Sequence, residues 1–225
     1  LQRNTLIPVW GWADANENVI VKFHNQQKAT KADKYGKWMV KLDIESAGGP
    51  YELSVVGNNA IQIKNILVGE VWICSGQSNM EWTVGQSKNA KQEIASAGSP
   101  LIRHIKIKRE ISSLPNKDIS EGRWLVCDST SVASFTAIGY FFAKEIYQQL
   151  KVPIGLINAS WGGTNIETWI SREAFESSPE FQEMIAGMPQ INLDSLSKLK
   201  IKGSEIRIEA LQGTKLKAIN TSSFN

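Results

Sequence analysis

The most constraining feature of this sequence is a nearly continuous apolar run, residues 66–74, that leads directly into Gly76-Gln77-Ser78. A strand has such a composition when both of its faces are buried, as in a parallel sheet covered by helices. A second run of this kind lies at residues 154–159. The spacing of apolar residues between the two runs predicts a helix at 89–97, a strand at 102–108 and a helix at 134–150. This alternation of strands and helices predicts an α/β fold.

The chain before this region has a different pattern. Short β-rich runs separated by Gly, Asn and Pro turns recur through residues 5–66. They predict a small β-sandwich or jelly-roll-like region over residues 1–66, followed by the α/β region at 67–183. The segment 184–225 holds one of the 19 aromatic residues of the chain, so it cannot bury a core of its own. We expect an insertion or linker there, with short helices at 194–200 and 205–212.

Composition excludes several classes of protein. The formal net charge of +3 gives no argument for a nucleic-acid partner. The longest uncharged runs contain polar residues and are too short to span a membrane. Two cysteines cannot form a disulfide framework, and they lack the spacing of a metal site, so with two histidines in the chain the composition does not favour a zinc site. We therefore expect neither a metal nor a cofactor.

Ser78 is the first candidate for chemistry. It lies just after the carboxyl end of a predicted buried strand, and open α/β sheets place their sites at the carboxyl ends of their strands. A helix that begins near Asn79 would direct its positive end and its free N–H groups toward this serine. The motif is not the Gly-x-Ser-x-Gly elbow of many esterases, because Met80 replaces the second glycine. The alternative is an ordinary helix N-cap, for which serine is a preferred residue.

A second motif, residues 158–165, follows the other buried strand and contains Gly162 and Gly163. Glycines at this place let the backbone approach a ligand and present N–H groups to it. The alternative is a turn that requires positive φ. Because both motifs follow strands of one predicted parallel sheet, we expect them to form a shared site at one edge.

Together these motifs resemble a known family. Residues 69–82 resemble the signature of the sialate O-acetylesterases, which are carbohydrate esterases of the SGNH-hydrolase superfamily. Residues 159–164 and 166–169 are similar to the second block of that family, and the β-rich start is similar to the sandwich-like region before its catalytic domain. The resemblance covers residues 1–183 and implies an SGNH-hydrolase-like parallel sheet with helices.

The resemblance also implies a mechanism. Ser78 would be the nucleophile of a serine esterase, and the N–H groups of Ser78 and Gly162 would form the oxyanion hole. The family takes a third donor from an Asn in a Gln-Gly-Glu block and its base from a later His, and neither block is found in this sequence. His24 and His104 match no family motif, so we expect both to be structural. The chain is then part of an esterase that needs a C-terminal half or a second chain.

Other side chains near the motifs have two possible roles each. The expected substrate-binding residues are Gln77, Asn79, Trp82 and Trp161. The tryptophans, with Trp169, suit sugar stacking and equally suit a core or rim position. Glu70 and Glu81 would suit a glycosidase pair, but for Glu70 we favour a structural role, either in a salt bridge or as a hydrogen-bonded group. Cys74 is predicted to be a small buried hydrophobe.

The function that this sequence favours is a carbohydrate O-acetylesterase that removes acetyl groups from sialic acid or another O-acetylated glycan. One alternative is a xylan or other polysaccharide acetylesterase with the same residues. The other is a non-catalytic glycan-binding fragment. No apolar core of a signal peptide follows Leu1. We expect a periplasmic, secreted or lysosome-like location, with the leader absent from this sequence.

Overall fold

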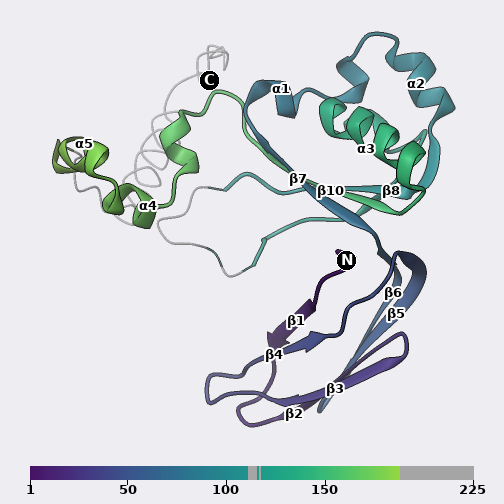
Figure 1. The fold of residues 1–225 in the computed structure, drawn as a ribbon, viewed down its shortest axis with the longest axis vertical. Coiled ribbons are helices and arrows are strands. Elements are labelled where there is room, and N and C mark those ends of the chain that lie inside the picture. The colour runs from purple at the N-terminus through teal and green to yellow at the C-terminus, as the bar shows by residue number, and fades with distance from the viewer. Residues whose placement is uncertain (111–115, 117, 188–225) are drawn as a thin grey trace, which may run out of the picture. The chain divides into compact units, whose positions relative to one another are not determined.

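A computed structural model describes residues 1–110, 116 and 118–187 of the chain (Figure 1). Its contacts divide the chain into two compact units, and the main one ends at Thr164. That main unit contains both the β-rich region and the α/β region. The predicted boundaries at residues 66 and 183 stay predictions. The helices predicted at 194–200 and 205–212 lie outside the described residues.

Six strands form the β-rich region, and the sequence pattern predicts all of them except the third. They are β1 (Ile7–Trp12), β2 (Asn18–Phe23), β3 (Gln26–Lys31), β4 (Lys37–Leu42), β5 (Gly48–Val56) and β6 (Ala60–Val68). Strands β1 and β4 pair antiparallel, and the other four form an antiparallel sheet in the order β3-β2-β5-β6. Alternate residues of β2 and β4 enter a common core, in which Val21, Phe23 and Leu42 are buried.

A four-stranded sheet is the centre of the α/β region. Its strands are β7 (Glu70–Gly76), β8 (Gly98–Lys106), β9 (Leu125–Asp128) and β10 (Ile154–Ser160), in the order β7-β10-β8-β9. Strands β7, β10 and β8 are parallel, and β9 is antiparallel to β8. The helices are α1 (Ser78–Glu81), α2 (Ala90–Ser96) and α3 (Ala137–Leu150). The predicted α/β class and its main elements are therefore confirmed.

The helices gather on one face of this sheet (Figure 1). There Phe135, Tyr140 and Ala143 pack with Ile154 and Leu156 of β10 in a buried cluster. Burial of such side chains contributes about 1.5–3 kcal/mol each for the large ones. Helix α3 ends where Lys151 adopts a left-handed conformation, with φ of 54°. This core fixes β7 and β10 beneath the helices, which sets the position of both motifs.

The prediction of one strand over residues 66–74 is wrong, because the run divides at Gly69. The N–H of Gly69 donates to the Leu1 carbonyl at 3.0 Å, and its own carbonyl accepts from the Arg3 N–H at 2.8 Å. A Cβ on Gly69 would lie 1.9 Å from the Pro153 carbonyl oxygen, so only glycine allows this close approach. The chain thus leaves the β-rich region at β6 and starts the α/β sheet at β7.

The prediction that this run is buried on both faces is also wrong. Trp72 is 42% exposed and Ile73 is 71% exposed. The reason lies in the layering, since α1, α2 and α3 share one side of the sheet (Figure 1). Cys74 packs in the core on that side, so the adjacent Ile73 points to the other side by the alternation of a strand. Trp72 lies on the helix side, where its ring meets that of Phe142 edge to face at 5.0 Å.

The second unit carries short helical segments in its described part. These are η3 (Ile166–Trp169), α4 (Arg172–Ser177), η4 (Pro179–Phe181) and α5 (Gln182–Gly187). Ser171 caps α4 by accepting from the Ala174 N–H at 3.2 Å. Across the described residues, the helices are too short or too polar to cross a membrane.

Candidate active site

The ends of β7 and β10 bring the two sequence motifs together. The strands are parallel neighbours with Gly76 opposite Ser160, and the Trp161 N–H donates to the Gly76 carbonyl at 2.9 Å. The segment after each strand therefore leaves the sheet at the same edge. This confirms the expectation that the motifs are adjacent.

Ser78 is the first residue of α1, and its side chain is exposed. Gly76 has φ of 129°, a conformation open to glycine, and this allows the chain to turn sharply from β7 into the helix. The alternative role of Ser78 as the N-cap is wrong, because Gln77 occupies that position. The Ser78 hydroxyl is thus presented at the helix start and at the carboxyl edge of the sheet.

Gly162 lies directly against Ser78. A Cβ on Gly162 would stand 3.0 Å from Ser78 Oγ and 3.4 Å from Ser78 Cα. Such a spacing is tight for a side chain, so glycine allows the turn after β10 to approach the serine. The predicted neighbours Ser78 and Gly162 therefore meet at one point, although their roles in catalysis stay predictions.

The Gly162 N–H already has a partner. It donates to Glu81 Oε2 at 2.7 Å, which joins the turn after β10 to the last residue of α1. The other carboxylate oxygen of Glu81 forms an ion pair with Arg109. The Arg109 guanidinium also lies 5.7 Å from the centre of the Trp161 ring, within the range of a cation–π contact.

Sequence reasoning missed this role of Glu81 and missed Arg109 entirely. Glu81 lies within the motif at residues 69–82, and this position was the one sequence feature that pointed to a role in the site. Arg109 follows β8 in a segment without a recognisable motif, and its approach to Glu81 depends on how that segment returns to the sheet edge.

The four residues predicted to bind substrate have different environments. The Gln77 side chain donates to the Thr164 carbonyl, which ties the two motifs together. Asn79 is exposed, Trp82 is 52% exposed, and Trp161 is half-buried beside Arg109. Both tryptophans thus retain accessible surface. Trp82 is near Ser78 in the sequence, and Trp161 directly precedes Gly162, which lies against Ser78. Their part in binding stays a prediction.

Glu70 and Cys74 have the structural roles that the sequence favours. Glu70 Oε1 accepts from Arg3 Nε at 2.6 Å at the start of β7, the opposite end of that strand from Ser78. Cys74 is a buried free thiol packed in the core, and burial raises its pKa. Glu70 and Glu81 therefore do not form a glycosidase pair.

His104 is buried in the core beneath the helices. It is 1% exposed, and its ring stacks on Phe135 at 4.5 Å between centres. Its Nε2 accepts from the Thr136 N–H at 3.4 Å, and the Thr136 hydroxyl donates to the Met80 carbonyl in α1 at 2.6 Å. Burial, and then the charge of Lys106, lower the pKa of His104 from 6.5 to about 4. This neutral ring supports α1 and confirms the structural role.

His24 lies in the β-rich region. Its Nδ1 is 3.3 Å from Glu45 Oε2, and its ring stacks on Tyr51. Its contacts therefore belong to the β-rich core and its surface, which is also a structural role. Within the described residues, neither histidine is placed as the base for Ser78.

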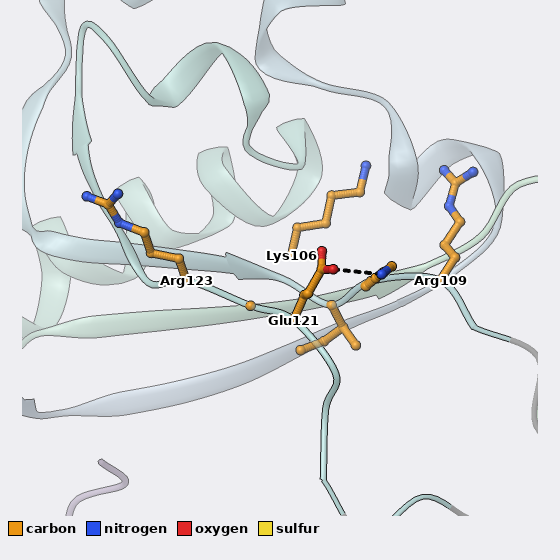
Figure 2. Close-up of a pocket in the computed structure, with 7 residues that line it drawn as sticks. Lys106, Arg109, Glu121 and Arg123 are labelled. Carbon is orange, nitrogen blue, oxygen red and sulfur yellow. Dashed lines mark hydrogen bonds and ion pairs between the residues drawn. The ribbon is translucent and has the colours of Figure 1, made fainter.

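A hollow of about 530 Å³ is lined by residues 106–109 and 121–123 (Figure 2). Its charged lining is mostly basic, with Lys106, Lys108, Arg109 and Arg123 against the single carboxylate of Glu121. Lys108 donates to Glu121 at 2.7 Å. Arg109 connects this hollow to the Glu81 carboxylate. The described residues contain no cluster of His, Cys, Asp and Glu that would hold a metal ion.

Ser78 at the start of the first helix of the α/β region, with Gly162 of the turn after the neighbouring strand β10 against it, is the arrangement that the two sequence motifs predict. Residues 68–203 match the family described as carbohydrate esterase, sialic acid-specific acetylesterase. The match covers more than half of the chain, and the protein therefore belongs to this family. The resemblance seen in the sequence motifs is confirmed.

Individual proteins that are similar in sequence or structure support the same family. The chain is 31% identical to the sialate O-acetylesterase of Mus musculus over 81% of its own length and 38% of the mouse protein. It is 33% identical to that of Rattus norvegicus over 75% of its length and 35% of the rat protein. A solved carbohydrate acetylesterase from Xanthomonas citri is 38% identical and superposes with a TM-score of 0.77, over 80% of this chain and 42% of that one. The chain thus spans about two fifths of the length of these relatives.

Proposed function

We propose that the protein is a carbohydrate O-acetylesterase with Ser78 as its nucleophile. Ser78 Oγ attacks the acetyl carbonyl, the sugar hydroxyl leaves with a proton, and an acetyl-enzyme forms. Water then attacks this ester and releases acetate and the free serine. The observation that carries the proposal is the meeting of Ser78 Oγ and Gly162 at the shared edge of β7 and β10.

The negative oxygen of each tetrahedral intermediate is held by the backbone N–H groups of Ser78 and Gly162. Donors fixed in advance at this position stabilise the transition state more than the ester itself, and removal of one donor typically costs about 10²–10³ in rate. The proton of Ser78 goes to a base outside the described residues. We propose that this base is a histidine from another segment of the protein or from a second chain.

The substrate class that we propose is an O-acetylated sugar. The matched family and the rodent relatives are named for sialic acid, which is a carboxylate sugar. The basic lining of the hollow beside Glu81 favours an acidic sugar in the same way. The Xanthomonas relative is named only as a carbohydrate acetylesterase, so a polysaccharide acetylesterase is the second candidate. We further propose a periplasmic, secreted or lysosome-like location, as expected for such substrates.

The test is acetate release by the full-length protein and by its Ser78→Ala variant. Loss of the nucleophile should lower kcat by roughly 10³-fold or more. Ser75→Ala is a matched control, because Ser75 is also exposed near the end of β7 and its hydroxyl donates to the Ala159 carbonyl at 3.5 Å. It should retain its activity. Acetyl release by the Ser78→Ala variant at the normal rate would contradict the proposal, and so would a wild-type protein that binds glycans without releasing acetate.

A panel of substrates separates the candidate sugars. O-acetylated sialic acid, acetylated xylan and a neutral acetylated monosaccharide are compared by kcat/KM. Preference for the sialic acid supports the first candidate, and preference for xylan supports the second.

A further inference from the structure

The Glu81 carboxylate occupies the place where the proposed mechanism needs an anionic oxygen. Glu81 Oε2 accepts the Gly162 N–H at 2.7 Å. A Cβ on Gly162 would lie 2.7 Å from that same oxygen and 3.0 Å from Ser78 Oγ. A negatively charged oxygen thus lies on the Gly162 donor and beside the nucleophile. An oxyanion formed on Ser78 would need the same donor and the same space.

Arg109 gives this carboxylate a second partner. It pairs with the other oxygen of Glu81, and its guanidinium lies over the Trp161 ring. Figure 2 shows Arg109 at one end of the basic hollow, which it lines together with Arg123. The Glu81 side chain is partly exposed, with 25% of its surface accessible, so the carboxylate is not enclosed by the protein. A carboxylate that leaves the Gly162 N–H therefore keeps a charged hydrogen-bond partner.

From this geometry we propose that Glu81 is an internal competitor for the oxyanion site, released toward Arg109 when an ester enters. Glu81 is then a positioning residue that determines how much of the free enzyme has an open site. The inference rests on the proposed function, because it assumes that Ser78 is the nucleophile and that the Gly162 N–H is an oxyanion donor.

The consequence for binding follows from the populations of the two states. An ester binds only the fraction of molecules in which Glu81 has left the Gly162 N–H, and its apparent affinity is reduced by that fraction. Once the ester is bound, the carboxylate has been displaced and the chemical step proceeds from the open site. Glu81 should therefore raise KM and leave kcat nearly unchanged. A residue that merely supports the fold would lower kcat when removed.

The experiment uses the full-length protein and 4-nitrophenyl acetate as a small ester that needs no sugar contacts. Glu81→Ala should lower KM by about tenfold with kcat within about twofold, which corresponds to about 1.4 kcal/mol in favour of the occupied state. Glu81→Gln keeps the size of the side chain and loses its charge, so it should lower KM by a smaller factor. Glu52→Ala, which removes an exposed carboxylate of the β-rich region, should change neither constant.

Arg109 provides an independent readout. Arg109→Ala removes the second partner of the carboxylate and should raise KM, because Glu81 then stays on the Gly162 N–H. The rise should vanish in the Glu81→Ala/Arg109→Ala double variant, where there is no carboxylate to hold. A rise of equal size in both backgrounds would mean that Arg109 acts on the ester itself and would contradict the proposal.

Other outcomes distinguish a failure of the proposed Glu81 role from a failure of the proposed function. A lower kcat or an unchanged KM in both Glu81 variants would overturn the role of Glu81, provided that Ser78→Ala is inactive. Full activity of Ser78→Ala would instead overturn the proposed function. If Glu81→Ala does not fold, Glu81→Gln decides the question, since it retains an oxygen that can accept from the Gly162 N–H.

Discussion

Acidification should destabilise this protein through His104. The buried imidazole has a pKa of about 4 in the folded chain, against 6.5 for an ordinary histidine. Between these two values the unfolded chain binds a proton that the folded chain does not, so stability falls as the pH falls. At about 1.4 kcal/mol for each pKa unit, the full loss is about 3 kcal/mol below pH 4. Above pH 6.5 the contribution of His104 does not change.

The reason for the low pKa is visible around the ring. The site is closed to water, and Nε2 already accepts the Thr136 N–H. A proton on Nε2 would remove this acceptor and place a charge in the core, next to the charge of Lys106. Protonation should therefore weaken the link from His104 through Thr136 to Met80, which supports α1.

Urea unfolding at pH 7.5 and at pH 4.5 measures this effect, with His104→Gln as the reference. The Gln side chain keeps an oxygen that can accept from Thr136 and does not titrate. Carboxylates titrate in the same range in both proteins, so only the difference between them reports on His104. The free energy of unfolding of the wild type should fall by about 2–3 kcal/mol more than that of the variant. Equal losses in the two proteins would refute the reasoning.

Two further predictions concern the site and the chain as a whole. Gly162→Pro removes the N–H beside Ser78 and should lower kcat by about 10²–10³-fold. The control Gly163→Asn, which places a side chain in open space at φ of 78°, should have little effect. Steady-state assays measure both rates, with thermal unfolding as a check on folding, and equal rates for the two variants would contradict the oxyanion role of Gly162. The 225-residue chain expressed alone should be nearly inactive, because neither histidine lies at Ser78. It should also self-associate, because the sheet exposes Ile73. A monodisperse monomer by analytical ultracentrifugation, with full Ser78-dependent turnover, would contradict this prediction.

The sequence predicts the class of fold well because the signals are local. Apolar runs and helical spacing locate β7, β10 and α3, and alternation locates β2. Strand β3 (Gln26–Lys31) is missed because its residues are mostly polar at the edge of a sheet. Strand β9 is missed because it has only four residues. Propensity is a weak guide for such strands, since pairing with a neighbour defines them.

The faces of the sheet could not be predicted in the same way. A continuous apolar run indicates that a strand can be buried on both faces, but it does not state which covering elements are present. Here α1, α2 and α3 share one face of the sheet, and Ile73 of β7 is left exposed. The break at Gly69 was equally hidden, because it depends on a contact with Pro153 from a distant part of the chain.

The site was predictable where it depends on strand order and not where it depends on side-chain partners. Ser78 and Gly162 follow parallel strands, and the ends of neighbouring parallel strands meet at one edge. The Glu81 carboxylate reaches the Gly162 N–H through the rotation of α1, and Arg109 reaches Glu81 from the segment after β8. Neither arrangement has a spacing in the sequence that would reveal it.

The most direct test of Ser78 as the nucleophile is to trap the acetyl-enzyme. The full-length protein is mixed with an activated acetyl ester, quenched in acid within the first turnover, digested and analysed by mass spectrometry. We expect one added acetyl group on the peptide that contains Ser75 and Ser78, located by fragmentation on Ser78 and absent from the Ser78→Ala variant. An acetyl group on another residue, with Ser78 unmodified, would contradict it.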